Sequence, residues 1–182
     1  DIGLYTAEKF DMRLDKYVTE ITLTTPTIGT HTYTYRDSQL ERVEILAQNV
    51  NKSNIIIKYK IVVTNEGQVP GYVKKIIDYL KEGTSFNSEI NQDWYISDNN
   101  RTVFNTSLEN TKINPGESKE VELVLSLTIT DENIGNIVNN NAEIYETYNE
   151  QGLTDIDSTE ANQAEQEDDM SKADIVLSVV TG

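Results

Sequence analysis

The sequence predicts an all-β domain built as an antiparallel β-sandwich. Two observations lead to this prediction: apolar residues recur with a period of two, and turn signals separate the alternating segments at short intervals. Helical periodicity is hard to find anywhere in the chain. Many short strands with turns between them are typical of two packed sheets. We therefore expect eight or so strands.

The expected strands can be placed in order along the chain. The clearest are IIIKYKIVVT at 55–64, which ends at the turn signal NEG, and VELVLSLTI at 121–129, whose apolar side chains share one face. GYVKKIIDYL at 71–80 is followed by the turn signal KEG. The other expected strands lie at 10–18, 32–35, 43–47, 103–108, 138–144 and 173–179. Residues 37–46 fit either a helical turn or a strand.

The chain divides into four consecutive parts. Residues 1–9 are expected to be a lead-in from a preceding module, and residues 10–150 the sandwich domain. Residues 151–172 contain the run TDIDSTEANQAEQEDD and are predicted to form an acidic loop or linker. Residues 173–182 are expected to form a C-terminal strand packed on the same sandwich.

The composition argues against several classes of function. Thirty-one acidic residues against fifteen Lys and Arg give a net charge of −16, which disfavours nucleic acid and anionic membrane surfaces as partners. No apolar run is long enough to span a membrane, so we expect no direct membrane contact by this segment. The absence of cysteine excludes disulfides and thiolate zinc sites. An extracellular domain without disulfides would need another stabilising constraint if it must survive mechanical or proteolytic stress.

A turnover enzyme is not expected. His31 is the only histidine, and it lies in THTYTY, which reads as an exposed strand without a G-x-S-x-G nucleophile motif. The nine glycines are scattered at turns and form no phosphate-binding loop. Among the 31 acids, no spacing singles out a pair suited to glycoside hydrolysis.

Acidic residues near the C-terminus form a candidate calcium site. Carboxylate oxygens are the ligands that calcium prefers, and here they are supplied by Asp155, Asp157, Asp168 and Asp169. Their spacing does not match the twelve-residue EF-hand loop, and an acidic run is more commonly just solvated. We therefore expect no required cofactor, with Ca²⁺ as the one candidate ion.

Lys16 breaks the pattern of the first strand, FDMRLDKYV. On a strand it shares one face with the apolar residues Phe10, Met12, Leu14 and Val18. A buried amine is costly unless it is paired or neutral, and burial lowers its pKa. The simplest alternative is a lysine that extends to the rim or meets one carboxylate.

Two further polar side chains are predicted to face the same core. Alternation places Asn140 on the inner face of its strand, and Asn141 or Asn139 there if the register differs. Asp78 shares a face with apolar residues in IIDYL. A desolvated Lys16 is a nucleophile, the Asn140 carboxamide an electrophile, and a protonated Asp78 could polarise the amide and shuttle protons. The product would be an isopeptide bond with loss of one ammonia.

Five short motifs occur in an order that resembles a known family. They are LDKYV (14–18), YKIVVTNEG (59–67), DYL (78–80), INPGES (113–118) and NNAEI (140–144). Together they resemble the conserved-repeat modules of Gram-positive surface proteins, which are related to the collagen-adhesin A-type (CnaA-like) domains. The resemblance covers about residues 10–144.

This resemblance implies an immunoglobulin-like or prealbumin-like sandwich at the cell surface or in the cell wall, next to other modules of a surface protein. It also implies an isopeptide bond between a first-strand lysine and a last-strand asparagine, with an acid between them in sequence. In this chain these residues are Lys16, Asn140 and Asp78. The end SKADIVLSVVTG (171–182) resembles the final strand that precedes an anchor in clostridial relatives.

We therefore expect a structural or stalk domain, hardened against force and proteolysis by its own cross-link. One alternative is an adhesin domain that binds an extracellular ligand through its loops. For that function Trp94, Tyr95 and residues 87–100 are the candidates, although Trp94 is also a candidate core anchor. Another alternative is a calcium-stabilised surface module without the cross-link.

Overall fold

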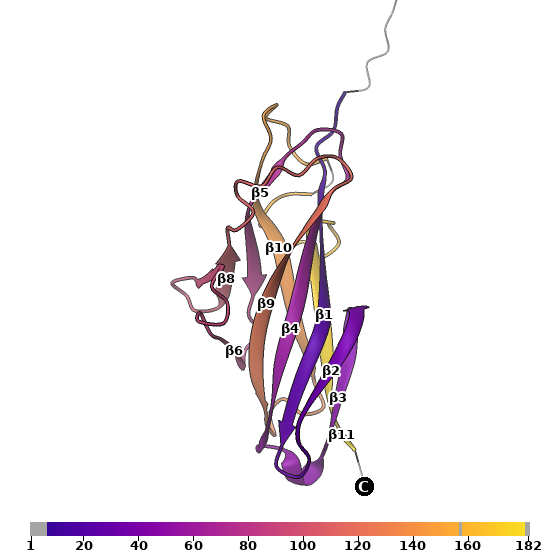
Figure 1. Ribbon diagram of the computed structural model, residues 1–182, viewed down its shortest axis with the longest axis vertical. Coiled ribbons are helices and arrows are strands. Elements are labelled where there is room, and N and C mark those ends of the chain that lie inside the picture. The colour runs from indigo at the N-terminus through magenta and orange to yellow at the C-terminus, as the bar shows by residue number, and fades with distance from the viewer. Residues whose placement is uncertain (1–6, 157, 181–182) are drawn as a thin grey trace, which may run out of the picture.

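The computed structural model describes residues 7–156 and 158–180, which form an elongated two-layer β-sandwich (Figure 1). Its strands are β1 (Met12–Thr25), β2 (Gly29–Ser38), β3 (Leu40–Leu46), β4 (Ser53–Asn65), β5 (Tyr72–Tyr79), β6 (Thr84–Phe86), β7 (Trp94–Ile96), β8 (Thr102–Asn105), β9 (Ser118–Ile129), β10 (Ile137–Tyr148) and β11 (Met170–Val180). A single 3₁₀ turn, η1 (Ala47–Asn49), follows β3. The first and last described residues lie at opposite ends of the long axis.

The strands form two sheets, which confirms the predicted all-β sandwich. The first sheet has the order β2-β1-β4-β9-β6, and the second has the order β3-β11-β10-β5-β8-β7. The ladders between described strands are antiparallel except for β11 and β3, which pair in parallel. The second sheet is therefore mixed, because the chain passes from β2 at the edge of one sheet to β3 at the edge of the other.

Most strands are longer than the sequence pattern indicated, except β5 and β8, which are shorter, and there are more strands than expected. The predicted strands at 55–64 and 121–129 lie within β4 and β9. Residues 40–46 form β3, so the strand interpretation of this segment is right and the helical turn is wrong. The three-residue strands β6 and β7 were not predicted, because so short a segment carries no periodic signal.

A β-bulge in β1 changes which side chains face the core. Up to Val18 the even-numbered residues are buried, and the register with both neighbouring strands shifts between Val18 and Glu20. After the bulge the odd-numbered residues Ile21 and Leu23 are buried instead. The inserted residue bends the strand and lets one long β1 line the core along most of its length.

The acidic segment between β10 and β11 lies against the outer face of β10. Glu143 is fully buried there, and its carboxylate accepts hydrogen bonds from the backbone N–H groups of Asn162 (2.7 Å) and Gln163 (3.0 Å). The Tyr79 hydroxyl donates to the same carboxylate at 2.7 Å. The segment is thus held by a buried acid, and β11 begins at Met170, directly after it.

No helix among the described residues has the length and apolar character needed to cross a membrane.

The NEG turn after β4 fixes the start of β1. The Asn65 side chain accepts a hydrogen bond from Gly67 N at 2.9 Å and donates to the carbonyl of Ile113 at 2.9 Å. Gly67 then passes so close to the chain before β1 that a Cβ atom there would lie 2.6 Å from Lys9 O and 2.8 Å from Asp11 N. Only glycine fits this contact without backbone movement.

We predict that Gly67→Ala lowers the free energy of unfolding by about 1–3 kcal/mol, because the added methyl group meets backbone atoms that cannot move independently. Denaturant unfolding measures this change. Glu66→Ala is the matched control, because Glu66 precedes Gly67 in the same turn and its own side chain is 39% exposed. Equal stability of the two variants would contradict the close approach.

Candidate functional site: a buried lysine, aspartate and asparagine

Three polar side chains meet in the core between the sheets. Lys16 comes from β1 in the first sheet, and Asp78 and Asn140 come from β5 and β10, which are neighbours in the second sheet. All three side chains are fully buried. The three residues singled out from the sequence pattern are therefore brought together, each inside an otherwise apolar strand face.

Asp78 contacts both of the other residues. A hydrogen bond joins Nζ of Lys16 to Oδ2 of Asp78. The carboxamide Nδ2 of Asn140 donates to Oδ1 of Asp78 at 2.7 Å and to the backbone carbonyl of Tyr79 at 3.2 Å. Asp78 thus holds the amine with one oxygen and the carboxamide nitrogen with the other.

Burial sets the protonation of this pair. Desolvation lowers the pKa of Lys16 and raises the pKa of Asp78, and in each case the charge of the partner opposes the shift. Asp78 is the one hydrogen-bond acceptor that Nζ meets among the described residues, whereas an ammonium has three N–H groups to satisfy. We therefore assign a neutral amine to Lys16 and a protonated carboxyl group to Asp78.

The aromatic ring of Tyr59 forms a wall of the site. Tyr59 is fully buried on β4, and its ring centroid lies 4.3 Å from Nζ of Lys16. The sequence reasoning missed this residue, although it shares the inner face of IIIKYKIVVT with four apolar side chains. An inward tyrosine on the strand next to Lys16 was the signal that could have identified it.

The two neighbouring asparagines lie on the outer side of β10. Asn139 donates to Asp174 at 2.9 Å, and Asn141 donates to Glu165 at 3.1 Å. Both are partly exposed, whereas Asn140 is fully buried. The register of β10 therefore presents Asn140, and neither of its neighbours, to Lys16.

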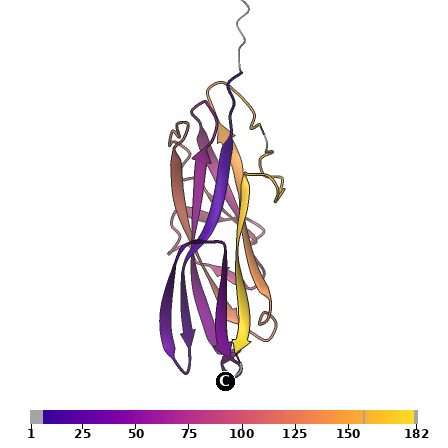
Figure 2. The same cartoon turned by 90° about the vertical axis from the view of Figure 1, so that its right-hand side faces the viewer.

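The backbone around Lys16 is held by side chains from the opposite sheet. Figure 2 shows β1 and β11 side by side, and here Lys16 N donates to Ser171 Oγ at 3.0 Å. The Gln39 amide donates to Lys16 O and to Ser171 Oγ, both at 3.2 Å. These contacts close the sandwich outside the buried site.

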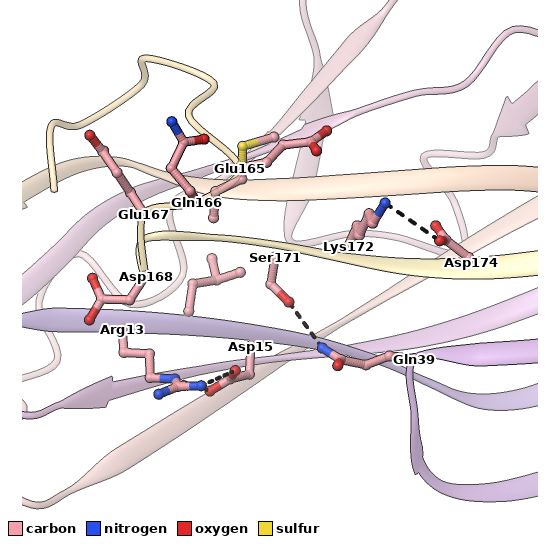
Figure 3. Close-up of a pocket in the computed structure, with 12 residues that line it drawn as sticks. Arg13, Asp15, Gln39, Glu165, Gln166, Glu167, Asp168, Ser171, Lys172 and Asp174 are labelled. Atoms are coloured by element: carbon pink, nitrogen blue, oxygen red, sulfur yellow. Dashed lines mark hydrogen bonds and ion pairs between the residues drawn. The ribbon is translucent and has the colours of Figure 1, made fainter.

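A polar pocket of about 440 Å³ lies on the solvent side of this seam (Figure 3). Its lining includes Arg13, Asp15, Gln39, Lys172 and Asp174. Lys16, Asp78 and Asn140 are not among its lining residues. These three side chains therefore face the closed core and do not line this pocket.

The candidate calcium residues are only partly brought together. Asp168 has a carboxylate oxygen within 4.8 Å of oxygens of Asp11 and Glu66, a group that the sequence reasoning did not predict. Ser158 connects Asp168 to Asp155, with hydrogen bonds of 2.7 and 3.3 Å. Three acids at this spacing offer the oxygen ligands of a cation site, although exposed acidic groups are common without an ion.

The other two calcium candidates are placed differently. Asp157 lies outside the described residues. Asp169 is not part of the three-acid group, and although it is 1% exposed, neither of its carboxylate oxygens has a hydrogen-bond partner among the described residues. Burial, and then the charge of Glu143, raises the pKa of Asp169 to about 8.

The residues considered for other functions lie apart from this site. Trp94 is 4% exposed and its indole N–H donates to Glu122 O at 2.7 Å, so the core-anchor interpretation is right and an exposed Trp94 is wrong. Tyr95 is 45% exposed on β7 and stacks on Phe104. His31 is exposed on the edge strand β2.

Asp169 makes the stability of the fold depend on pH. Its folded-state pKa lies above the ordinary value, so between about pH 4 and 8 the folded state holds a proton that the unfolded state has lost. The contribution of this group to the free energy of unfolding is therefore fully present below about pH 4 and is lost as the pH rises through about 8. The loss is at most about 1.4 kcal/mol per pH unit. We predict that Asp169→Asn flattens the fall of the melting temperature between these pH values.

The matched control for this measurement is Asp98→Asn, because Asp98 is an exposed acid. It should leave the pH dependence of the wild type unchanged. A melting temperature whose pH dependence is the same with and without Asp169 would show that this carboxyl group ionises normally in the fold.

No family model and no curated protein matches the chain. Solved structures that it resembles include two of a CARDB domain from Pyrococcus furiosus. The match to the solution NMR structure of that domain has 16% sequence identity and a TM-score of 0.40, and it covers 96% of this chain and 100% of the CARDB chain. The crystal structure, in complex with di-metal ions, has 14% identity and a TM-score of 0.39, and covers 97% of this chain and 100% of its own.

Proposed function

We propose that this protein is a cell-surface structural or stalk domain whose sandwich is locked by a self-catalysed isopeptide bond between Lys16 and Asn140. The observation that carries the proposal is the fully buried Asp78, which contacts both the amine and the carboxamide. The five motifs that resemble Gram-positive surface modules support the location. No turnover is involved, since the domain modifies itself once.

The contacts support a balanced reaction. The lone pair of the neutral Lys16 Nζ attacks Cγ of Asn140, and the new C–N bond forms as the carbonyl π electrons move onto Oδ1. Asp78 gives its proton to Nδ2 and takes one from Nζ, so its protonation state is restored. The C–Nδ2 bond then breaks, and one molecule of ammonia leaves.

Packing holds the amine and the carboxamide close together in a fixed arrangement, which an ordinary amide in solution lacks. The three side chains are fixed by three different strands, which replaces a bimolecular encounter with a preorganised one. Burial keeps the amine neutral and keeps water away from the carbonyl carbon. These two effects favour aminolysis over hydrolysis at Asn140.

The bond would tie the two sheets together. It connects β1 in the first sheet to β10 in the second and closes a loop of about 124 residues, from position 16 to position 140. By analogy with disulfide loops, this closure stabilises the fold by roughly 5 kcal/mol. In a chain without cysteine, it is the covalent constraint that a stalk under load needs.

We predict that the intact mass of the purified chain is lower than the sequence mass by one ammonia. Lys16→Met removes the nucleophile and Asp78→Asn removes the proton shuttle, so both variants should keep the full mass. Lys58→Met is the matched control, because Lys58 lies on the outer face of β4 beside Glu20. A wild-type chain of full mass would end the proposal.

The bond should also raise stability. We predict that Lys16→Met, an apolar side chain of similar shape, lowers the free energy of unfolding by roughly 5 kcal/mol relative to the cross-linked wild type. Lys16→Met also leaves the buried Asp78 carboxyl group without its amine partner, which adds about 1–3 kcal/mol to the loss. Denaturant unfolding of the two chains measures it, and equal stabilities would argue against a mechanical role.

A further inference from the structure

Two buried polar atoms next to the reacting groups have no hydrogen-bond partner among the described residues. They are Oδ1 of Asn140 and the hydroxyl oxygen of Tyr59. Unpaired buried polar atoms are rare in folded proteins, and a role in chemistry is one of the few explanations for them. Here one atom can only accept a hydrogen bond, and the other can donate one.

The orientation of the Asn140 amide is determined by its surroundings. Nδ2 faces the carbonyl oxygen of Tyr79, which can only accept, as well as Oδ1 of Asp78. Turning the amide over would set two carbonyl oxygens against each other. Asp78 therefore serves the leaving nitrogen, and Oδ1, where negative charge develops during attack, is left without a donor.

Tyr59 is placed to supply this donor. Its ring lies 4.3 Å from Nζ of Lys16, and its side chain is fully buried on the inner face of β4, which faces the second sheet. Lys16 in turn contacts Asp78 on β5, the strand next to β10, which carries Asn140. The phenol therefore reaches from the first sheet toward the strand of the electrophile. Burial raises the pKa of Tyr59, so the hydroxyl stays protonated and can donate.

We propose that Tyr59 is a further catalytic residue of the cross-linking reaction, whose hydroxyl donates a hydrogen bond to Oδ1 of Asn140 in the tetrahedral intermediate. The proposal rests on the isopeptide function proposed above. When the lone pair of Nζ bonds to Cγ, the carbonyl π pair moves onto Oδ1, and the phenol stabilises that charge without giving up its proton. The pair returns to re-form the carbonyl as ammonia leaves.

The ring of Tyr59 has a second part in the same step. The attacking nitrogen becomes positively charged as its bond to Cγ forms, and the face of an aromatic ring attracts such a charge. The ring also occupies space that water would need to reach Nζ. Tyr59→Phe keeps both effects and removes only the hydroxyl, so it isolates the proposed hydrogen bond.

The test follows the reaction in freshly made protein. The full 182-residue chain is produced by cell-free translation, samples are stopped with denaturant at successive times, and intact mass gives the fraction that has lost ammonia. Tyr59→Phe should slow this loss by roughly 100- to 1,000-fold, as for removal of one oxyanion donor. Tyr17→Phe, next to Lys16 but outside the core, should react at the wild-type rate.

A second measurement separates catalysis from folding. In chains that also carry Lys16→Met, and so cannot react, Tyr59→Phe should unfold at the same denaturant concentration or higher, because it removes an unpaired buried hydroxyl. The pH profile of the residual reaction should keep its midpoint, since the phenol does not titrate in the working range. A slow reaction with a stable fold and an unshifted profile supports the proposal.

Three outcomes would overturn it. A wild-type rate in Tyr59→Phe shows that the hydroxyl has no part in the reaction, while the isopeptide function stands. If Tyr59→Phe slows the reaction and also destabilises chains that carry Lys16→Met, Tyr59 has a structural role. A wild-type chain that never loses ammonia removes the proposed function itself, and this inference with it.

Discussion

The hydrogen bonds of Asp78 are the interaction on which the rest of the site depends. Burying a lysine amine or a carboxamide in this core costs free energy unless its polar atoms are hydrogen-bonded. The Asp78 carboxyl group supplies a hydrogen-bond partner to both. Because the carboxyl group is itself buried, it is stable there as the neutral acid, and the amine beside it stays neutral too. The packing of these side chains and the chemistry proposed for them therefore have the same physical cause.

Strand alternation was enough to predict the three main residues of the site. Lys16 and Asn140 interrupt apolar faces with a strict period of two, and such a face must meet another in a sandwich. Their convergence could not be read from either strand alone, because it depends on how β1 is placed across from β5 and β10. Tyr59 was missed since a tyrosine on an inner face reads as ordinary core.

Other features depend on contacts that leave no local pattern. The bulge after Val18 reverses the inward face of β1, and no residue in the sequence marks it. The parallel pairing of β3 with β11 joins segments more than 130 positions apart. Glu143 reads as one more acid in a polar stretch, yet it is buried by the backbone of a segment that composition alone describes as a loop.

The position of β11 limits what the proposed cross-link would protect. A pull along the long axis enters through β1 and leaves through β11, since the described chain begins and ends at opposite poles. Once the isopeptide bond has formed, the residues between Lys16 and Asn140 would not bear this load. About 40 residues beyond Asn140 stay on it, held only by hydrogen bonds and packing, and fully drawn out they span roughly 130–140 Å. Such a domain would have a limited extension, because the most by which it could lengthen is that drawn-out length less the distance that the segment already spans in the fold.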